Sequence, residues 1–367
     1  MSFDAAVLRS AGSPLNIERL EIGNLSDTDV LVRIKATSLC HTDLEAVEGQ
    51  LATPLPLVPG HEAVGVVEWV GKLVRDPAVG DAVVISWNPH CDHCFYCAKH
   101  QPILCQQYRD NAAHSMHFDG KPRLFAAGEP VHQLMYAGTF AEMVVVTPAC
   151  AVKIPREIPL DLACLIGCGV MTGVGAALNV AQVEPGSSVS VIGCGAVGLS
   201  AIQGAKLAGA ATIIAIDREP GKLETARVFG ATHTLIANDA LVGEHAALTS
   251  GRGADYVFEA AGNEAAFRAS MEIVRPGGQV VWLGKVPVSR DIALRWGSLM
   301  GEKKIIRSSY GGTQPAKDFP FLANAYLEGR LLLDEYVTSR IKLEDINLGL
   351  QRLKQGLEIR SVIEFAS

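Results

Sequence analysis

The feature that most constrains the fold is a glycine-rich turn between a β-branched run and an apolar stretch. The run SVSVI ends at residue 192, Gly193, Gly195 and Gly198 follow in the spacing G-x-G-x-x-G, and residues 199–208 have a helical length. Such a strand-to-helix turn lets the backbone approach a pyrophosphate, and the helix N-terminus adds partial positive charge. We therefore expect a Rossmann-type dinucleotide-binding unit, with Ala196 and Val197 also at the cofactor.

An acidic residue at the end of the next β-branched run indicates which dinucleotide binds. Asp217 ends the run TIIAID. A carboxylate there accepts hydrogen bonds from the adenosine ribose and repels a 2′-phosphate, so we predict NAD rather than NADP despite the neighbouring Arg218. Further β-branched runs at 254–261 and 279–284 alternate with helical stretches, which predicts a doubly wound parallel sheet.

The chain before about residue 155 has a different pattern. Short β-rich segments, such as 30–36 and 63–71, are separated by turn residues. After residue 310, helical stretches at 319–332 and 343–355 precede a strand at 361–365, and we expect this tail to return to the first domain. Residues 106–136 have little pattern, and we expect them to form a surface excursion.

Size and charge limit the function classes. The chain has 367 residues, 49% of them hydrophobic, which excludes a disordered or fibrous protein and favours two domains. The formal net charge of −7 argues against nucleic acid and anionic membranes as partners. The N-terminus lacks the pattern of a signal peptide and no apolar run reaches transmembrane length, so we expect a cytoplasmic protein.

Four cysteines lie close together in the first domain. They lie within a span of fifteen residues, in a chain too large to need disulfides, and their four thiolates would complete a tetrahedral shell. They are Cys91, Cys94, Cys97 and Cys105. We predict a structural zinc site, with an iron–sulfur cluster as the alternative. The histidines nearby are alternative ligands that we expect to face solvent: His90, His93 and His100.

A second set of metal-ligating residue types is dispersed along the chain. It comprises Cys40-His41-Thr42-Asp43, Gly60-His61-Glu62 and Gly167-Cys168-Gly169. Each segment by itself is more often structural than functional, because buried cysteines and hydrogen-bonded histidines are common in protein cores. Their functional interpretation depends on their occurring together.

The chain resembles the zinc-dependent medium-chain alcohol dehydrogenases. The resemblance rests on these segments together with the four-cysteine lobe, the glycine turn, Asp217 and Ile359-Arg360. Within the family, it is to the class III-like members with a longer chain, of the aryl- or hydrophobic-alcohol type. The resemblance implies an α/β protein with two domains. A GroES-like β-rich catalytic domain would comprise residues 1–169 and 310–367, with the structural zinc lobe at about 90–106. A Rossmann coenzyme domain would comprise residues 170–309.

The resemblance also implies roles for individual residues. Cys40, His61 and Cys168 would bind a catalytic zinc with one position open, an arrangement known for catalytic zinc. Thr42 would take the alcohol proton, Asp43 would orient His61, and Glu62 would lie behind the metal. The residues expected at the cofactor besides the glycine turn and Asp217 are His41, Lys222 and Arg360. Many family members have a histidine where this chain has Glu45, which we leave outside the catalytic set.

The implied activity is oxidation of an alcohol to its aldehyde, by hydride transfer from a zinc-bound alkoxide to NAD, with two zinc ions per subunit. Trp87, Phe140 and the apolar stretch 51–57 would line the pocket, which suits a hydrophobic aryl or medium-chain primary alcohol.

Two other functions remain open at this point. A glutathione-dependent formaldehyde dehydrogenase shares Gly167-Cys-Gly-Val and Arg109 with this chain, although residues 50–58 here contain no acid. A non-catalytic protein that binds NAD and zinc on the same fold is the alternative from another class. We expect a homodimer formed along the segments 279–286 and 303–309, and the role of Lys285 is open.

Overall fold

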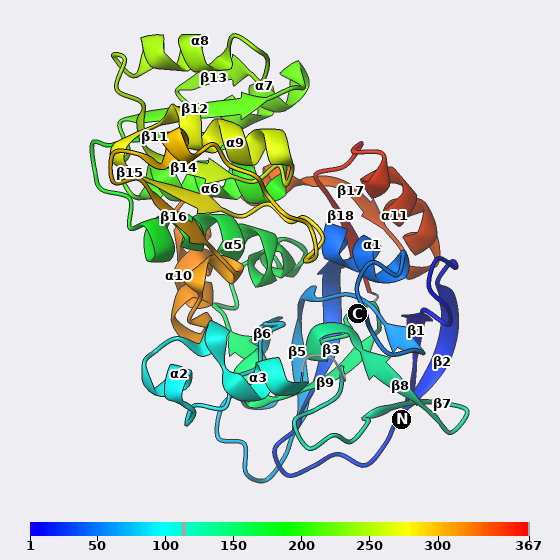
Figure 1. Ribbon diagram of the computed structural model, residues 1–367. Coiled ribbons are helices and arrows are strands. Elements are labelled where there is room, and N and C mark those ends of the chain that lie inside the picture. Colours follow the sequence, from blue (N-terminus) through cyan, green and yellow to red (C-terminus); the bar gives the residue numbers. More distant parts are fainter. Residues whose placement is uncertain (112–114, 366–367) are drawn as a thin grey trace. The chain divides into compact units, whose positions relative to one another are not determined.

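The computed structural model describes residues 1–111 and 115–365, and the chain forms two compact units. Unit 1 consists of residues 1–168 together with those from 314 onward, and unit 2 consists of residues 169–313. Unit 2 is therefore inserted into the sequence of unit 1 (Figure 1). The candidate metal-ligating residues all belong to unit 1.

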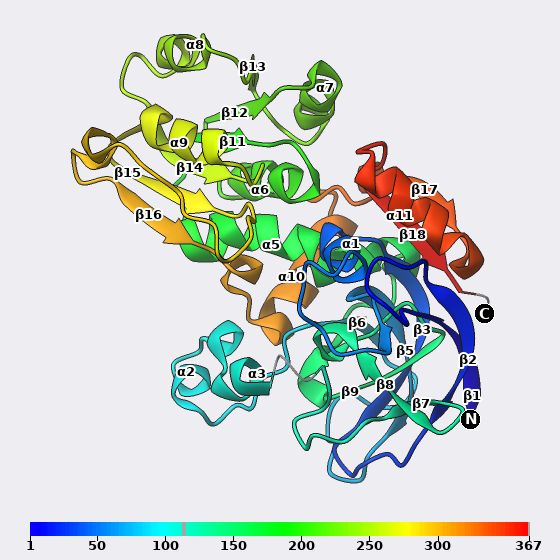
Figure 2. The ribbon, with the colours of Figure 1, turned by 45° about the vertical axis from the view of Figure 1, so that its right-hand side comes forward.

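Unit 1 is built on two sheets that are mostly antiparallel (Figure 2). The five-stranded sheet has the order β1 (Ser2–Val7), β2 (Asn16–Ile22), β7 (Leu124–Ala126), β8 (Glu129–Gln133), β4 (Leu57–Val58). The second sheet has the order β10 (Ala151–Lys153), β6 (Ala82–Ile85), β5 (Glu62–Val70), β3 (Val30–Ser38), β18 (Arg360–Glu364), β17 (Val337–Ile341), and β9 (Met143–Val146) also pairs with β3.

Strand β3 lies inside this second sheet, between β5 and β18, and carries apolar side chains. Val30, Val32 and Ile34 alternate along β3 and are fully buried in one hydrophobic cluster, the pattern of a strand with a core-facing side. The C-terminal strand β18 pairs antiparallel with β3 over Val362–Glu364. The tail of the chain therefore completes the sheet in which β3 ends just before Cys40 and β5 begins just after His61.

The helices of unit 1 are short, apart from two in the tail. They are α1 (His41–Val47), α2 (Phe95–Ala98), α3 (Gln106–Asn111), α4 (Leu160–Ala163), α10 (Pro315–Leu327) and α11 (Ile346–Lys354). In the described residues, no single helix is both long and apolar enough to cross a membrane. Leu160–Gly167 and Gly169–Ala181, interrupted by a break, meet that requirement only when counted together.

The expectation of a surface excursion at 106–136 is wrong for most of the segment. Residues 124–133 form β7 and β8, and Leu124 and Val131 are buried in the core. Arg123 is also buried and pairs with Asp29, its Nε lying 2.5 Å from Oδ2. Residues 112–114 of the predicted excursion lie outside the described residues.

Unit 2 contains the predicted doubly wound parallel sheet. Its order is β13 (His233–Ile236), β12 (Thr212–Asp217), β11 (Ser188–Ile192), β14 (Ala254–Glu259), β15 (Val274–Trp282), β16 (Lys304–Arg307), and all five pairings are parallel. The helices are α5 (Gly169–Gly175), a π-helical turn (Ala176–Ala181), α6 (Ala196–Leu207), α7 (Pro220–Val228), α8 (Leu241–Leu248) and α9 (Glu264–Ile273). The α/β fold class predicted from the sequence is thus confirmed.

Candidate active site

One carboxylate joins the two N-terminal segments of the dispersed set. Cys40 is the N-cap of α1, and the Asp43 side chain, in the first turn, accepts the Cys40 backbone N–H at 3.0 Å through Oδ2. Its Oδ1 accepts the backbone N–H of Gly60 at 3.0 Å and lies 2.9 Å from Nδ1 of His61. The start of α1 and the turn before β5 are therefore fixed relative to each other by a buried side chain.

The structure brings Cys40, His61 and Cys168 together. Their ligand atoms all lie within 4.8 Å of one another, although the residues come from three separate segments. His61 is 1% exposed, and its Nε2 is buried and makes no hydrogen bond to any residue in the described part of the chain. Two thiols facing an unpartnered imidazole nitrogen are the donor set that zinc prefers, so these residues fit a zinc ion.

The electrostatics of this cluster favour a thiolate at Cys40. Hydrogen bonding from Cys168 lowers the pKa of the Cys40 thiol well below its usual value, and the pKa of Cys168 is raised correspondingly. Burial alone would lower the pKa of His61, but the charge and hydrogen bond of Asp43 raise it well above its usual value. A thiolate is therefore available at Cys40 for a cation.

Glu62 and Arg360 form a buried ion pair next to this cluster. Nε of Arg360 donates to Oε2 of Glu62 at 2.9 Å, and the two side chains are 6% and 0% exposed. Arg360 is expected at the cofactor, and in the structure its guanidinium also has a carboxylate partner. The charge of Arg360 helps to lower the pKa of Cys40, so this pair belongs to the surroundings of the candidate metal ligands.

The remaining residues expected near the substrate lie in different environments. His41 is exposed at the start of α1, and Thr42 after it is half-buried. Trp87 is half-buried beside Tyr108, with ring centroids 6.4 Å apart. Phe140 was expected in the pocket, but it is fully buried in the hydrophobic core and packs directly beneath Gly60, whose added Cβ would lie 2.6 Å from the Phe140 ring.

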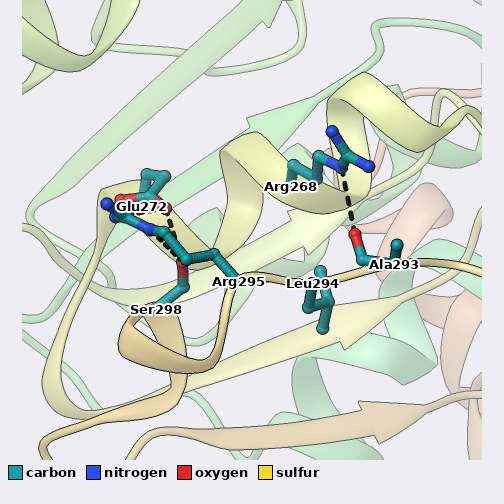
Figure 3. A pocket seen from close by; sticks show the side chains of 6 residues that line it. All are labelled: Arg268, Glu272, Ala293, Leu294, Arg295 and Ser298. Carbon is teal, nitrogen blue, oxygen red and sulfur yellow. Dashed lines mark hydrogen bonds and ion pairs between the residues drawn. The ribbon is translucent and has the colours of Figure 1, made fainter.

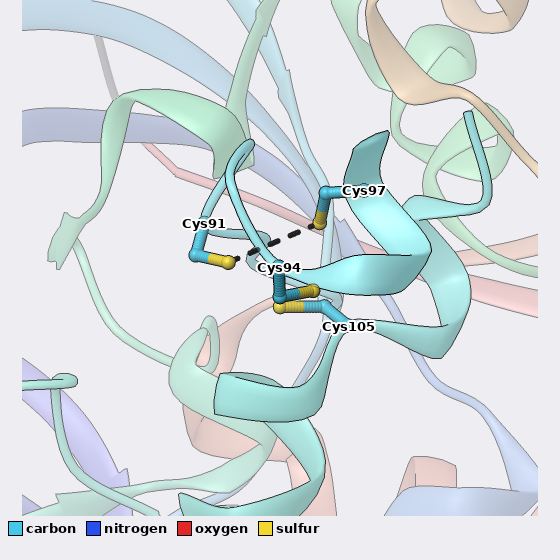
Figure 4. A group of neighbouring side chains, drawn as sticks. All are labelled: Cys91, Cys94, Cys97 and Cys105. Carbon is cyan, nitrogen blue, oxygen red and sulfur yellow. Dashed lines mark hydrogen bonds between the residues drawn. The ribbon is translucent and has the colours of Figure 1, made fainter. Parts of the chain in front are cut away.

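The four cysteines of the lobe also converge (Figure 4). Their sulfur atoms lie within 4.8 Å of one another, and they come from a loop, α2 and the end of a short helix: Cys91, Cys94, Cys97 and Cys105. Backbone N–H groups of Cys97 and Gln106 lower the pKa of the Cys94 thiol to about 6. His93 and His100 are exposed, as predicted, but His90 is not: its side chain is 15% exposed and its Nε2 lies 3.2 Å from Oδ1 of Asp92. The four sulfur atoms by themselves fit a closed metal site.

The glycine turn of unit 2 has the geometry that a dinucleotide requires. Gly193 has a φ of +93°, and a Cβ at Gly198 would lie only 1.8 Å from the Gly193 carbonyl oxygen. At the exposed Gly195, a Cβ would meet no described atom within 4 Å. The first and third glycines are thus needed for the turn, and the second leaves the backbone open to a phosphate, so this turn fits a pyrophosphate. Ala196 and Val197 begin α6 beside it.

Asp217 lies at the same turn, at the end of β12. Its Oδ2 accepts the Cys194 N–H at 2.8 Å and its Oδ1 accepts the Glu219 N–H at 3.0 Å. The carboxylate is half-exposed, which leaves it accessible to a ribose. Lys222 is exposed in the first turns of α7.

A pocket of about 300 Å³ in unit 2 contains none of the predicted site residues (Figure 3). Its charged side chains already have partners. Arg268 Nε donates to the Ala293 carbonyl at 3.0 Å, and Arg295 Nη2 donates to the Glu272 carboxylate at 3.0 Å. It therefore offers little to a charged ligand.

Sequence reasoning missed one residue at the carboxyl end of the parallel sheet. Glu259 ends β14 and is fully buried. The available signal was an acid closing a β-branched run just before Ala-Ala-Gly, the same position relative to its strand that Asp217 has.

Comparison with known proteins identifies the family. The chain matches the family models "Alcohol dehydrogenase GroES-like domain" over residues 26–156 and "Zinc-binding dehydrogenase" over residues 196–326. It is 37% identical over 364 residues to the class-3 alcohol dehydrogenase of Myxine glutinosa, covering 98% of this chain and 97% of the relative.

Solved structures agree with this relationship. An alcohol dehydrogenase zinc-binding domain protein from Burkholderia ambifaria superposes with a TM-score of 0.95 at 35% identity, covering both chains fully. Benzyl alcohol dehydrogenase from Acinetobacter calcoaceticus gives a TM-score of 0.94 at 29% identity, also over both full chains. The fold is that of a zinc-dependent oxidoreductase, and the chain belongs to the zinc-dependent medium-chain alcohol dehydrogenase family. The resemblance noted in the sequence is thereby confirmed.

Proposed function

We propose that the protein oxidises hydrophobic primary alcohols, aryl or medium-chain, to aldehydes with NAD as the hydride acceptor. The observation that carries this proposal is the Cys40–His61–Cys168 cluster, in which a buried imidazole nitrogen without a hydrogen-bond partner faces two thiols. Three protein ligands would leave one coordination position for substrate if zinc were bound, the arrangement of catalytic rather than structural zinc. The retained cluster and the family membership favour an enzyme over a non-catalytic binding protein.

The cofactors would supply the electronic part of the reaction: zinc as a Lewis acid for the alcohol oxygen, and NAD as the hydride acceptor. The chain's own residues would prepare the site. Asp43 holds the His61 ring so that Nε2 faces the thiols, and the Glu62–Arg360 pair balances charge beside them. Thr42, half-buried on α1 two residues after Cys40, would carry the proton of the alcohol away.

Partly exposed aromatic side chains in unit 1 support an apolar substrate. Trp87, Tyr108 and Phe118 are half-buried. The Trp87 ring centroid lies 6.4 Å from that of Tyr108, and the rings of Tyr108 and Phe118 each lie 5.6 Å from that of the buried Tyr136. Trp87 follows β6, and β6 contacts the Cys168 segment so closely that a Cβ at Gly167 would lie 2.8 Å from the Ile85 carbonyl. Aromatic walls favour aryl and alkyl groups over polyols, whose hydroxyls need polar partners. The similarity to a benzyl alcohol dehydrogenase supports the same substrate class.

Glutathione-dependent formaldehyde oxidation is the second candidate. The class-3 relatives, at 36% and 37% identity, favour it. Arg109 is exposed on α3 with its guanidinium 5.2 Å from the Tyr96 ring centroid, where it could meet a substrate carboxylate. The absence of acids from residues 50–58 weighs against this activity.

The assembly and compartment are also proposals. β16 is an edge strand of the parallel sheet and carries Ile306 at 37% exposure, so it could pair with a second copy in a homodimer. β15, which we also expected at the dimer contact, is an inner strand between β14 and β16.

All nine cysteines are free thiols, which suits a reducing cytoplasm. The proposed loading is two zinc ions per subunit, one in each cysteine-containing cluster.

The function is tested by measuring initial rates with NAD⁺ and with NADP⁺. The substrates are benzylic, terpenoid, linear and polyol alcohols, and formaldehyde with and without glutathione. We expect NAD⁺ reduction with apolar primary alcohols, and its loss in Cys168→Ala together with one of two zinc ions. Turnover only of formaldehyde plus glutathione would establish the second candidate, and near-normal turnover by Cys168→Ala would refute the ligand assignment.

A further inference from the structure

A buried carboxyl group lies where two loops meet at the carboxyl end of the parallel sheet in unit 2. Oε1 of Glu259 accepts the backbone N–H groups of Ala261 at 2.9 Å and Gly262 at 2.7 Å. Its main-chain carbonyl accepts those of Leu283 at 2.7 Å and Gly284 at 2.9 Å. One residue thus fixes both the turn after β14 and the segment after β15.

These loops approach the carboxyl group too closely for larger residues. A Cβ at Gly284 would lie 2.4 Å from Oε2 of Glu259 and 2.4 Å from the Gly262 nitrogen. Gly262 has a φ of +67°, and a Cβ there would lie 2.7 Å from the Lys285 carbonyl oxygen. Oε2 itself is buried without a hydrogen-bond partner in the described residues. The two loops are therefore packed around this carboxyl group and depend on its shape.

The turn after β14 also touches the glycine turn. The Ala260 N–H donates to the Ile192 carbonyl at 2.8 Å, and a Cβ at Gly193 would lie 2.7 Å from the Ala261 nitrogen. β11 and β14 are neighbours in the sheet although β12 and β13 lie between them in sequence. Ligands of doubly wound sheets bind outside the carboxyl ends of the strands at this change of direction.

We propose that Glu259 is a positioning residue for the second mononucleotide of the bound dinucleotide, holding residues 260–262 and 283–285 in place against Gly193. This inference rests on the proposed use of NAD. A doubly wound sheet consists of two mononucleotide-binding halves. Asp217 ends a strand of the half that would hold the adenosine, so Glu259, at the end of β14, belongs to the half that would hold the nicotinamide mononucleotide.

The charge state of the carboxyl group is compatible with this role. Burial raises the pKa of Glu259 to about 7, against the opposing effects of the backbone N–H groups and of Arg307 on β16. The other charged residue on these segments is Lys285, directly after Gly284. At pH 8 the carboxylate is the major form, and hydrogen bonds to a charged acceptor are the stronger ones.

The test compares NADH with AMP as ligands of the full-length, zinc-loaded protein at pH 8, using NADH fluorescence and calorimetry. Glu259→Gln keeps the size and one acceptor oxygen but loses the charge. We expect its NADH Kd to rise about tenfold and its AMP Kd to change less than about twofold, because AMP would occupy only the half with Asp217. Glu244→Gln, an exposed change on α8 of the same unit, should leave both constants unchanged.

If Glu259→Gln does not fold, Glu259→Asp retains the charge but withdraws it by one methylene, and it should weaken NADH binding selectively as well. An unchanged NADH Kd, or equal weakening of NADH and AMP, would overturn the positioning role. Failure of the unaltered protein to bind either ligand would instead refute the proposed function, so the two failures can be told apart.

Discussion

Nδ1 of His61 lies 2.9 Å from Oδ1 of Asp43, and both side chains are almost fully buried, at 1% and 0% exposure. The same carboxylate accepts the backbone N–H groups of Cys40 and Gly60. One side chain therefore positions two of the three candidate ligands, and it leaves the other imidazole nitrogen facing the thiols.

Replacing Asp43 by Asn should weaken zinc binding at this cluster by about 10- to 100-fold, because an amide cannot accept hydrogen bonds from all three groups. Chelator competition followed by metal analysis measures the effect. Glu48→Gln, just beyond the end of the same helix, serves as the control and should bind zinc normally. Unchanged affinity in Asp43→Asn would mean that this carboxylate does not support the ligands.

Cys97→Ala should destabilise the four-cysteine lobe, because there metal binding is part of local folding. We expect loss of one zinc ion per chain and faster proteolysis within residues 90–106, located by mass spectrometry. Cys168→Ala is the matched comparison, since it should also lose one zinc ion but keep the lobe resistant. Equal cleavage in both variants would contradict separate roles for the two clusters.

Asp217→Asn should shift the cofactor preference towards NADP⁺. The amide keeps an oxygen acceptor for a backbone N–H group but no longer repels a 2′-phosphate. We expect the ratio of kcat/KM for NAD⁺ to that for NADP⁺ to fall by about 10- to 100-fold, an effect of about 1.4–2.8 kcal/mol. Asp239→Asn, exposed in the same unit, provides the control. A constant ratio would show that Asp217 does not select the cofactor.

His245 should make the protein less stable in acid. Its Nε2 lies 2.8 Å from Oγ of the buried Ser190, and burial lowers its pKa to about 4. The unfolded imidazole binds a proton below about pH 6.5, whereas the folded one does so only below about 4. The neutral His245 imidazole therefore contributes its full share to the free energy of unfolding above pH 6.5. This contribution falls by up to about 3 kcal/mol as the pH drops to 4.

Urea unfolding at pH 7.5 and pH 5 measures this dependence. His245→Gln, which can still meet Ser190, should lose less stability between the two values than the unaltered protein. His233→Gln changes an exposed histidine of the same unit and should behave like the unaltered protein. The same slope for all three would exclude His245 as the source.

The sequence was enough to predict those features of the fold and the site that depend on residues close together in the chain. The spacing of Gly193, Gly195 and Gly198 determines a turn within six residues, and Asp217 follows at the end of the next strand. The four lobe cysteines are close in sequence, so they could scarcely be far apart in space. Cys40 and Asp43 likewise lie in one helical turn, and the structure brings both to His61.

The sequence could not reveal partners that only the tertiary fold brings together. Arg360 and Glu62 are 298 residues apart, and Arg123 and Asp29 are 94 apart. From the sequence we expected Arg360 at the cofactor and assigned no partner to Arg123. The burial of Arg123 against Asp29 is one reason why the expectation of a surface excursion at 106–136 is wrong. Phe140 is apolar whether it lines a pocket or a core, so its burial required the structure.

The pairing of β18 with β3 has a consequence for the order of synthesis. Unit 2 is complete in sequence once residue 313 has left the ribosome, and its strands need no later segment. Unit 1 still lacks a strand of its central sheet and the cation for Glu62 until residues 360–364 emerge. A nascent chain can therefore fold unit 2 while the candidate metal ligands of unit 1, although already translated, still lack the strand that completes the central sheet.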